Sequence, residues 1–439
     1  MTMTPQESSA ASDLANRWSR IPRRQRAREF NRLPRGAQDD FFLELPAPDQ
    51  ADLLQKLPKS ERRVWVRLLA PADVADVLQQ MRESERAQYL ELLDEPARSE
   101  VNALLAFKED EAGGLMSPRF ARLRVDAPVE EALAYLKQQA PNLKDIAEAF
   151  VLDQDKHLVG VVSLSELFLG DRNKRVREVM RTDFATVDQH MDQEQVARAL
   201  RASHLHAIPV VDAEKHMVGV VTVDDIVGVI DEEASEDMQK VGGMEALDEP
   251  YLETGFFELI KKRAGWLAIL FLGEMLTATA LGYFEGELDK AVVLALFLPL
   301  IISSGGNSGS QATTLVIRAM ALGEVALRDW FRVIRRELFA GIALGCILAV
   351  IGMTRIFAWQ GMFGSYGQHY FVLALTIAFS LVGVVMFGTI AGAALPFILR
   401  RVGLDPASAS APFVATLVDV TGLIIYFTVA KLVLTGSLL

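Results

Sequence analysis

Asp419 is the residue whose type and setting most clearly indicate chemistry. It is a lone carboxylate in the apolar stretch from Ala411 to Phe427, and the only basic residue in the continuation of that stretch is Lys431, twelve positions further on. Burying an unpaired carboxylate in hydrocarbon costs several kcal/mol. A cation, a proton pathway or a basic partner must offset this cost, and we favour a cation site.

A second polar group interrupts another apolar stretch, between Pro299 and Gln311. Its glycines, hydroxyls and amides suit a regular lipid-facing helix poorly, so we expect irregular backbone that lines a water-filled cavity. Close packing between helices would explain Gly305 and Gly309, but not the polar side chains around Asn307.

Two further sets of carboxylates lie near these stretches. Glu274 also falls in an apolar segment, where it acts as an auxiliary pore or gating charge or else bonds a neighbouring helix; the sequence leaves both open. The run from Asp231 to Lys240 carries five carboxylates on a connector that leads into the apolar half, and the segment from Val227 onwards predicts a helix. Such acids form either a solvated face or a site for divalent cations.

The elements that position these residues follow from the uneven composition. The chain of 439 residues is 51% hydrophobic and 23% charged. Up to Ile260 there are 48 acidic and 32 basic residues, a net charge of −16, whereas the remainder has nine and thirteen, a net charge of +4. An acidic soluble half therefore precedes a membrane half, and the acidic balance argues against a nucleic-acid partner.

The membrane half predicts five spans, because each apolar segment reaches the roughly 20 residues that cross hydrocarbon. They lie at about 265–284, 291–318, 337–357, 371–399 and 411–436. Basic residues gather before the first span and in alternate connections, at Lys261 to Arg263, Arg328 to Arg336, and Arg400 with Arg401. The positive-inside rule places the N-terminal half in the cytoplasm and the C-terminus outside.

The soluble half contains an internal repeat. The segment from Leu158 to Leu167 recurs 59 positions later from Met217 to Ile226. Each copy predicts a helix, two strands joined by a turn and a closing helix, which resembles a tandem pair of CBS domains.

The residues before this repeat predict an all-α superhelical domain. Pairs of leucine and proline recur every twelve residues, at Leu33-Pro34, Leu45-Pro46 and Leu57-Pro58. Proline suits the start of a short helix, and regular spacing suits a stacked array.

Three motifs resemble the MgtE family of magnesium channels: Gly305-Gly306-Asn307-Ser308-Gly309-Ser310-Gln311, Asp405-Pro406-Ala407 and Thr416-Leu417-Val418-Asp419-Val420-Thr421-Gly422. The order of parts is also similar, so the chain reads as a multidomain membrane protein. The expected parts are a helical N domain at 1–114, α/β CBS domains at 115–175 and 176–232, plug or connecting helices at 233–263, and a five-helix transmembrane domain at 264–439.

The resemblance implies a homodimeric, Mg2+-selective channel of the cell membrane with its pore on the two-fold axis. Asp419 of both subunits would face a hydrated ion, with the backbone of Ala415 and the side chain of Asn307 as outer partners. Other divalent ions such as Mn2+ and Co2+ are further candidates. A secondary transporter coupled to H+ or Na+ is the alternative, because a midplane carboxylate suits that class equally well.

The resemblance also implies that cytosolic Mg2+ closes the channel by binding acidic sites. The corresponding residues here are Asp225, Glu233, Glu236, Asp237, Asp76 and the carbonyl of Gly114. Gly228 and Ala72 stand where a familiar member has acidic residues, so one regulatory site is expected to be weaker or absent.

CBS domains also bind adenine nucleotides, so ATP is a second expected ligand. In the second copy Thr222 and Asp225 fit a Thr-x-x-Asp pattern for the ribose and phosphates, and His206, Ala207 and Pro209 would flank the base. We expect no enzyme activity, since no nucleophile, base and orienting acid form a recognisable set. A membrane-anchored receptor without transport is disfavoured, because an anchor would need neither Asp419 nor the polar second span.

Overall fold

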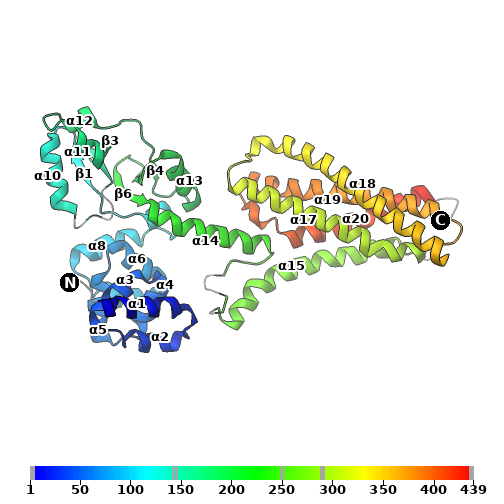
Figure 1. Ribbon diagram of the computed structural model, residues 1–439, viewed down its shortest axis with the longest axis horizontal. Helices are drawn as coiled ribbons and strands as arrows, with labels where there is room; N and C mark the ends of the chain where they lie inside the picture. The colour runs from blue at the N-terminus through cyan, green and yellow to red at the C-terminus, as the bar shows by residue number, and fades with distance from the viewer. Residues whose placement is uncertain are drawn as a thin grey trace. The chain divides into compact units, whose positions relative to one another are not determined.

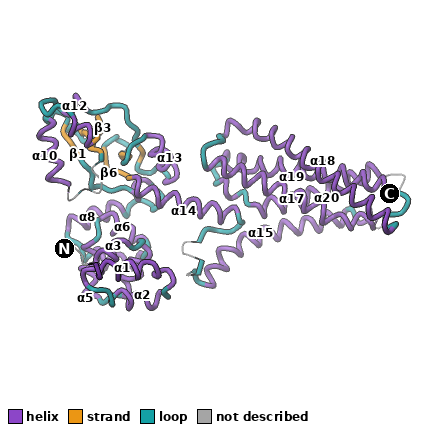
Figure 2. Tube along the Cα trace, viewed as in Figure 1, coloured by secondary structure: helices purple, strands orange, loops and turns teal. Residues whose placement is uncertain are grey.

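The computed structural model describes residues 5–140, 143, 147–247, 251–252, 254–286 and 292–434. The chain divides into two compact units, Met1–Asp231 and Glu232–Leu439. Within the described residues, strands occur only in the first unit and the second unit is helical (Figures 1 and 2). The predicted fold classes, a helical N domain, α/β repeats and apolar helices, are confirmed.

The N-terminal part of the first unit is a run of short helices. Pro34, Pro46 and Pro58 stand directly before three of them, so proline ends each preceding turn and its fixed φ starts the next helix. The helices are α1 Pro5–Arg17, α2 Arg23–Phe30, α3 Arg35–Glu44, α4 Ala47–Lys56, α5 Lys59–Leu68, α6 Pro71–Gln79, α7 Glu83–Leu90, α8 Glu95–Leu104 and α9 Ala112–Leu115.

An aromatic cluster holds these helices together. Phe30 and Phe42 are fully buried, and the ring of Trp65 lies 5.1 Å from each of them, centroid to centroid. Burial of a phenylalanine side chain contributes roughly 1.5–3 kcal/mol, so this cluster alone outweighs the weak propensity of such short helices.

Each repeat of the first unit folds into a small mixed sheet. The sheet orders are β1-β2-β3 and β4-β5-β6, with the first pair parallel and the second antiparallel in both. The first copy contains β1 Arg122–Arg124, α10 Val129–Gln139, β2 Glu148–Leu152, β3 Leu158–Ser163 and α11 Leu164–Leu169. The second contains α12 Val176–Val179, β4 Val187–Asp188, α13 Gln193–Ser203, β5 Ala207–Val211, β6 Met217–Thr222 and α14 Val223–Val241.

The two copies exchange methionines. Met180, which precedes the second sheet, packs on Gly160 of the first, and Met116, which precedes the first sheet, packs on Gly219 of the second. A Cβ at Gly160 would lie 2.4 Å from the Met180 sulfur, so only glycine leaves room for the contact. The recurring glycine of the repeat is therefore a packing residue between the copies.

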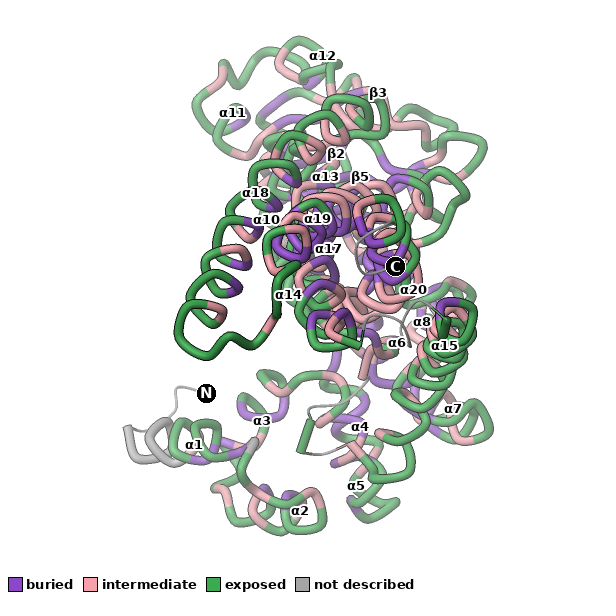
Figure 3. Tube along the Cα trace, turned by 90° about the vertical axis from the view of Figure 1, so that its right-hand side faces the viewer, coloured by how far each residue is buried: buried purple, intermediate pink, exposed green. Residues whose placement is uncertain are grey.

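Among its described residues, the second unit contains five helices that are long and apolar enough to cross a membrane. Besides the C-terminal part of α14, it comprises α15 Phe256–Tyr283, η3 Val292–Phe297, α17 Leu298–Ala321, η4 Leu327–Asp329, α18 Trp330–Phe363, α19 Tyr370–Arg401, η5 Pro406–Ser408 and α20 Ala411–Leu434. The core lies where α17, α18 and α20 pack on α19. Figure 3 shows buried residues on α17 and α19 and mostly exposed ones along α15, none of whose residues is buried.

The connecting segment expected at 233–263 runs directly into the first span, because α15 begins at Phe256. One local expectation is wrong. The segment from Pro299 to Gln311 is regular helix within α17 rather than irregular backbone.

Close packing explains why the glycines of α17 stay helical. A Cβ on Gly388 would lie 2.3 Å from the carbonyl oxygen of Gly305, and one on Gly392 would lie 2.2 Å from that of Gly309. The helices α17 and α19 thus cross with their backbones in contact, which gives dispersion contacts that hydrocarbon itself cannot replace.

We expect Gly392→Ala to destabilise the second unit, because the new methyl group would collide with the backbone of α17. Overpacking typically costs about 1–3 kcal/mol, and each kcal/mol lowers the melting temperature by about 2–4 °C in a unit of this size. Thermal unfolding in detergent, followed by circular dichroism, measures the shift. The matched control is Gly361→Ala in α18, where a Cβ meets nothing within 4 Å. Equal melting temperatures for the two variants would contradict the prediction.

Candidate ion pathway and sensor residues

A polar stripe runs along the exposed side of α17. Ser303, Asn307, Gln311 and Thr314 follow one another at spacings of three or four residues, so they share one helix face, and all four are exposed. The Asn307 Nδ2 atom donates to Ser303 Oγ at 3.4 Å. The opposite face, which includes Gly305, is buried against α19 and α20. The helix therefore presents amides and hydroxyls away from its own bundle.

The predicted pore residues of α20 lie next to this helix. Ala415 faces Gly306, since a Cβ on Gly306 would sit 3.5 Å from the Ala415 Cβ. Asp419 follows one turn later and is half-buried. Because α20 is a regular helix here, the Ala415 carbonyl already accepts the N–H of Asp419 and retains one lone pair for a water.

Glu274 meets Asp419. The carboxyl groups of these two residues, from α15 and α20, lie within hydrogen-bonding reach of each other. One turn away the helices touch closely, because Gly273 leaves room for the methyl group of Thr416. Two carboxylates this close repel each other unless a proton or a cation lies between them, so Glu274 is a candidate for the same site as Asp419.

The acidic connector is one helix. Asp225, Glu233, Glu236 and Asp237 all lie on α14, and the last three are spaced so that they share a face. Asp225 caps the start of this helix, where its Oδ2 accepts the Thr222 N–H at 2.9 Å. Glu233, Glu236 and Asp237 belong to the second unit.

The remaining predicted sensor residues lie in the first unit. Asp76 is half-buried on α6, and Gly114 is buried on α9. The glycine is required at this position by space, since a Cβ would lie 2.2 Å from the Lys108 carbonyl oxygen. Gly228 on α14 has nothing within 4 Å of a would-be Cβ, so a side chain there would point into open space.

Lys240 ties the end of α14 to the turn before α20. Its Nζ atom lies 2.6 Å from Asp405 Oδ2 and also pairs with Glu236. Burial alone would lower the pKa of the Lys240 ammonium, but the two carboxylates outweigh burial and raise that pKa above its usual value. Asp405 also accepts the Ala407 N–H at 2.8 Å, so it holds the short helix η5 as well. The motif Asp405-Pro406-Ala407 is thus a connection between the acidic helix and the predicted pore helix.

The predicted nucleotide residues already have partners within the protein. Thr222 Oγ1 donates to Asp225 Oδ2 at 2.7 Å, which is a helix cap rather than an open phosphate site. The backbone N–H groups of His206 and Ala207, expected to flank the base, donate to the carboxylate of Glu148 at 3.1 and 3.2 Å. Pro209 lies within β5.

Sequence reasoning missed Glu148, which is 5% exposed and also contacts the His206 ring. A charged residue at the start of a buried strand was the available signal. A base that used the N–H groups of His206 and Ala207 would have to displace this carboxylate.

Comparison with protein families matches most of the chain, apart from residues 233–297 and short segments elsewhere. Residues 298–429 match the family described as MgtE, a divalent cation transporter. Residues 10–110 match the MgtE intracellular N domain, and residues 112–170 and 176–232 match the CBS domain.

Individual relatives agree over most of the length. The magnesium transporter MgtE of Thermus thermophilus is 42% identical over 344 residues, which cover 78% of this chain and 74% of the relative. The magnesium transporter MgtE of Bacillus subtilis is 33% identical over 330 residues, 75% and 71% of the two chains. A crystal structure of the cytosolic domain of the Mg2+ channel MgtE in complex with ATP covers 51% of this chain and 93% of its own, with 34% identity and a TM-score of 0.47.

These matches confirm the predicted family and its parts. The protein is a multi-pass membrane protein with an intracellular N domain, and because its relatives are transporters it is not an enzyme. The identity and coverage of the Thermus thermophilus relative, together with the matched domains in their order, establish that this chain belongs to the MgtE family.

Proposed function

We propose that this chain is a Mg2+-selective channel that admits Mg2+ to the cell down its electrochemical gradient. The observation that carries the proposal is the polar stripe of α17 beside Asp419 of α20. Amides, hydroxyls and a carboxylate on apolar helices cannot face lipid without cost, but they suit a water-filled pathway. The relatives at 42% and 33% identity are named magnesium transporters, which supports Mg2+ as the cargo.

A hydrated ion fits these residues better than a bare one. Mg2+ gives up its waters reluctantly and is usually held through them by one or two carboxylates. Asp419 supplies the charge, and Asn307 with the free lone pair of the Ala415 carbonyl would accept or donate bonds to the retained waters. A membrane potential of 100 mV, negative inside, favours entry of a divalent ion by about 4.6 kcal/mol, so no further energy source is required.

A homodimer follows from the same surfaces. The polar stripe and α15 are exposed in the single chain, although both belong to apolar helices. A second copy related by a two-fold axis would cover the stripe with its own equivalent and bring two Asp419 carboxylates to one pore. The connections rich in arginine support a cytoplasmic N-terminal half and a C-terminus outside.

Coupled transport is the second candidate, and the contact between Glu274 and Asp419 favours it. A pair of carboxyl groups that binds either a proton or a divalent ion can exchange one for the other. In that case the protein would be a secondary divalent-cation transporter driven by H+, or by Na+ if that ion occupies the same pair.

Cytosolic Mg2+ would regulate the pathway through the acidic helix α14. Glu233, Glu236 and Asp237 gather negative charge on one face of α14, which would attract cations, and Asp225, Asp76 and the Gly114 carbonyl are further proposed ligands. Lys240 and Asp405 then carry a change in α14 directly to the turn that precedes the pore helix. Mn2+ and Co2+ are candidates for the same sites, because carboxylate oxygens also suit these ions.

We expect Asp419→Ala to abolish most Mg2+ flux into liposomes, because the charge that attracts the ion is lost. Influx is measured with an entrapped Mg2+ indicator, and Glu324→Gln, at an exposed position in the connection after α17, serves as the control. Undiminished influx through the Asp419 variant would refute the assignment of this residue. An influx that requires an imposed proton gradient would favour the coupled transporter.

We expect millimolar Mg2+ to slow proteolysis of the cytoplasmic region in the full-length protein, since bound ions hold the acidic elements together. The double variant Glu233→Gln/Asp237→Asn should lose most of this protection, whereas Glu258→Gln, exposed at the start of α15, should keep it. Equal cleavage rates with Mg2+ and with chelator in the wild type would count against the sensor.

ATP as a regulatory ligand is tested by the same digest. If the base of bound ATP uses the N–H groups of His206 and Ala207, it must displace the Glu148 carboxylate, so added ATP should protect the second repeat only at high concentration. Replacement of Glu148 by alanine should lower the ATP concentration needed, and no protection of either protein would exclude the ligand.

We expect Lys240→Gln to loosen the end of α14. The pair with Asp405 is about one-third exposed, so its loss should cost about 1 kcal/mol, or roughly a fivefold faster amide exchange. Hydrogen exchange over residues 236–247 measures the effect, and Lys261→Gln, an exposed lysine at the start of α15, is the control. Unchanged exchange in the Lys240 variant would show that this ion pair does not hold the helix.

A further inference from the structure

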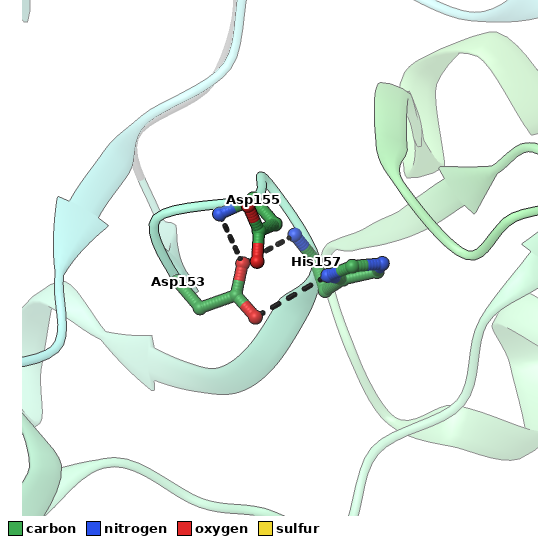
Figure 4. A group of neighbouring side chains, drawn as sticks. All are labelled: Asp153, Asp155 and His157. Carbon is green, nitrogen blue, oxygen red and sulfur yellow. Dashed lines mark hydrogen bonds and ion pairs between the residues drawn. The ribbon is translucent and has the colours of Figure 1, made fainter.

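The turns between the paired strands of both repeats carry the same cluster of metal-ligating groups. Asp153, Asp155 and His157 form one cluster, and Asp212, Glu214 and His216 form the other, with ligand atoms within 4.8 Å of one another in each. Figure 4 shows the first cluster closing the turn between β2 and β3. None of these residues takes part in the pathway or sensor proposed above.

The backbone presents one carboxylate oxygen to one ring nitrogen in each turn. Asp153 Oδ1 accepts the N–H groups of Asp155 and His157 at 2.9 and 2.8 Å, which leaves Oδ2 facing His157 Nδ1 at 3.3 Å. In the second turn Asp212 Oδ1 accepts the His216 N–H at 2.8 Å, and Oδ2 lies 3.0 Å from the His216 Nδ1. Neighbouring ligands around Zn2+ are about 3.3 Å apart, so either pair can hold an ion in place of the shared proton.

The two clusters lie side by side. The rings of His157 and His216 stack with their centroids 4.6 Å apart, and the two histidines form an antiparallel bridge. Lys156 and Lys215, at φ of 66° and 69°, turn the backbone in the same way before each histidine. The histidine side chains are 38% and 37% exposed, so ions can reach them from solvent.

The ligand types of the two clusters suit divalent ions. Four carboxylates and two imidazoles offer two neighbouring positions, each with two carboxylates and one imidazole.

We propose that each turn binds one divalent transition-metal ion through a set of two carboxylates and one imidazole, giving two sites per chain next to each other in the CBS pair. The imidazole nitrogen selects ions such as Zn2+ over Mg2+, which prefers oxygen ligands only. Binding replaces the Nδ1 proton, which passes to solvent. The stacked histidines lie at the contact between the two repeats. We therefore expect the bound ions to stabilise this contact by fixing the two rings.

Zn2+ binding to the full-length protein in detergent, with any affinity tag removed, tests the proposal. After dialysis against micromolar Zn2+ and millimolar Mg2+, we expect the wild type to retain about two more Zn2+ per chain than the double variant His157→Gln/His216→Gln. Each single histidine variant should retain about one fewer than the wild type. Asp155→Asn removes only the third ligand and should weaken one site about tenfold or more.

His190→Gln is the matched control, because His190 Nδ1 contacts Glu111 at 3.1 Å in a comparable pair for which the described residues offer no third ligand. It should retain as much Zn2+ as the wild type. X-ray absorption should show imidazole scattering around the retained Zn2+ in the wild type and not in the double variant. Equal Zn2+ in the wild type and the double variant, or complete displacement by Mg2+, would overturn the proposal and leave the clusters as turn-closing contacts.

Discussion

The backbone contact between α17 and α19 is the constraint on which the membrane unit depends. Gly305 and Gly309 meet Gly388 and Gly392 so closely that no side chain fits between the helices. This contact fixes the rotation of α17 about its own axis, because the glycine face must turn inward. Ser303, Asn307, Gln311 and Thr314 then lie on the face that points away from the bundle, and the proposed pathway lies along that face. A packing interaction thus decides the position of the polar chemistry.

Contacts between charged groups are a second recurring feature of the membrane unit. Glu274 lies against Asp419, and Lys240 lies between Asp405 and Glu236. In each case an isolated charge would be costly near or within hydrocarbon, and contact with a second group reduces that cost or makes it depend on a bound ion. In the proposed channel, the arrangement would link ion occupancy to helix position at two levels, one inside the apolar helices and one at the end of α14.

Local patterns predicted the elements well, because their causes are local. Prolines at twelve-residue spacing start helices, apolar runs form the spans, and the repeat forms two similar sheets. Contacts between distant residues left no such pattern: Lys240 and Asp405 are 165 positions apart, and Glu148 and His206 are 58 apart. The glycines of α17 misled us because glycine breaks exposed helices but joins buried ones, and only the neighbouring helix decides between these outcomes. Asp419 stood out as a candidate site residue because a charge in an apolar stretch has few explanations.

The exchanged methionines have a consequence for synthesis. Met180 covers Gly160 of the first sheet but follows that sheet in the sequence. Met116 precedes both sheets, and its partner Gly219 is synthesised about a hundred residues later. As the chain leaves the ribosome, the first repeat therefore stays incomplete until the second has emerged nearly to α14. Cutting the chain between the copies would leave each half with an open glycine groove and an uncovered methionine. The pair of repeats, rather than either copy alone, is therefore the smallest segment that could be moved to another protein or deleted without exposing these surfaces.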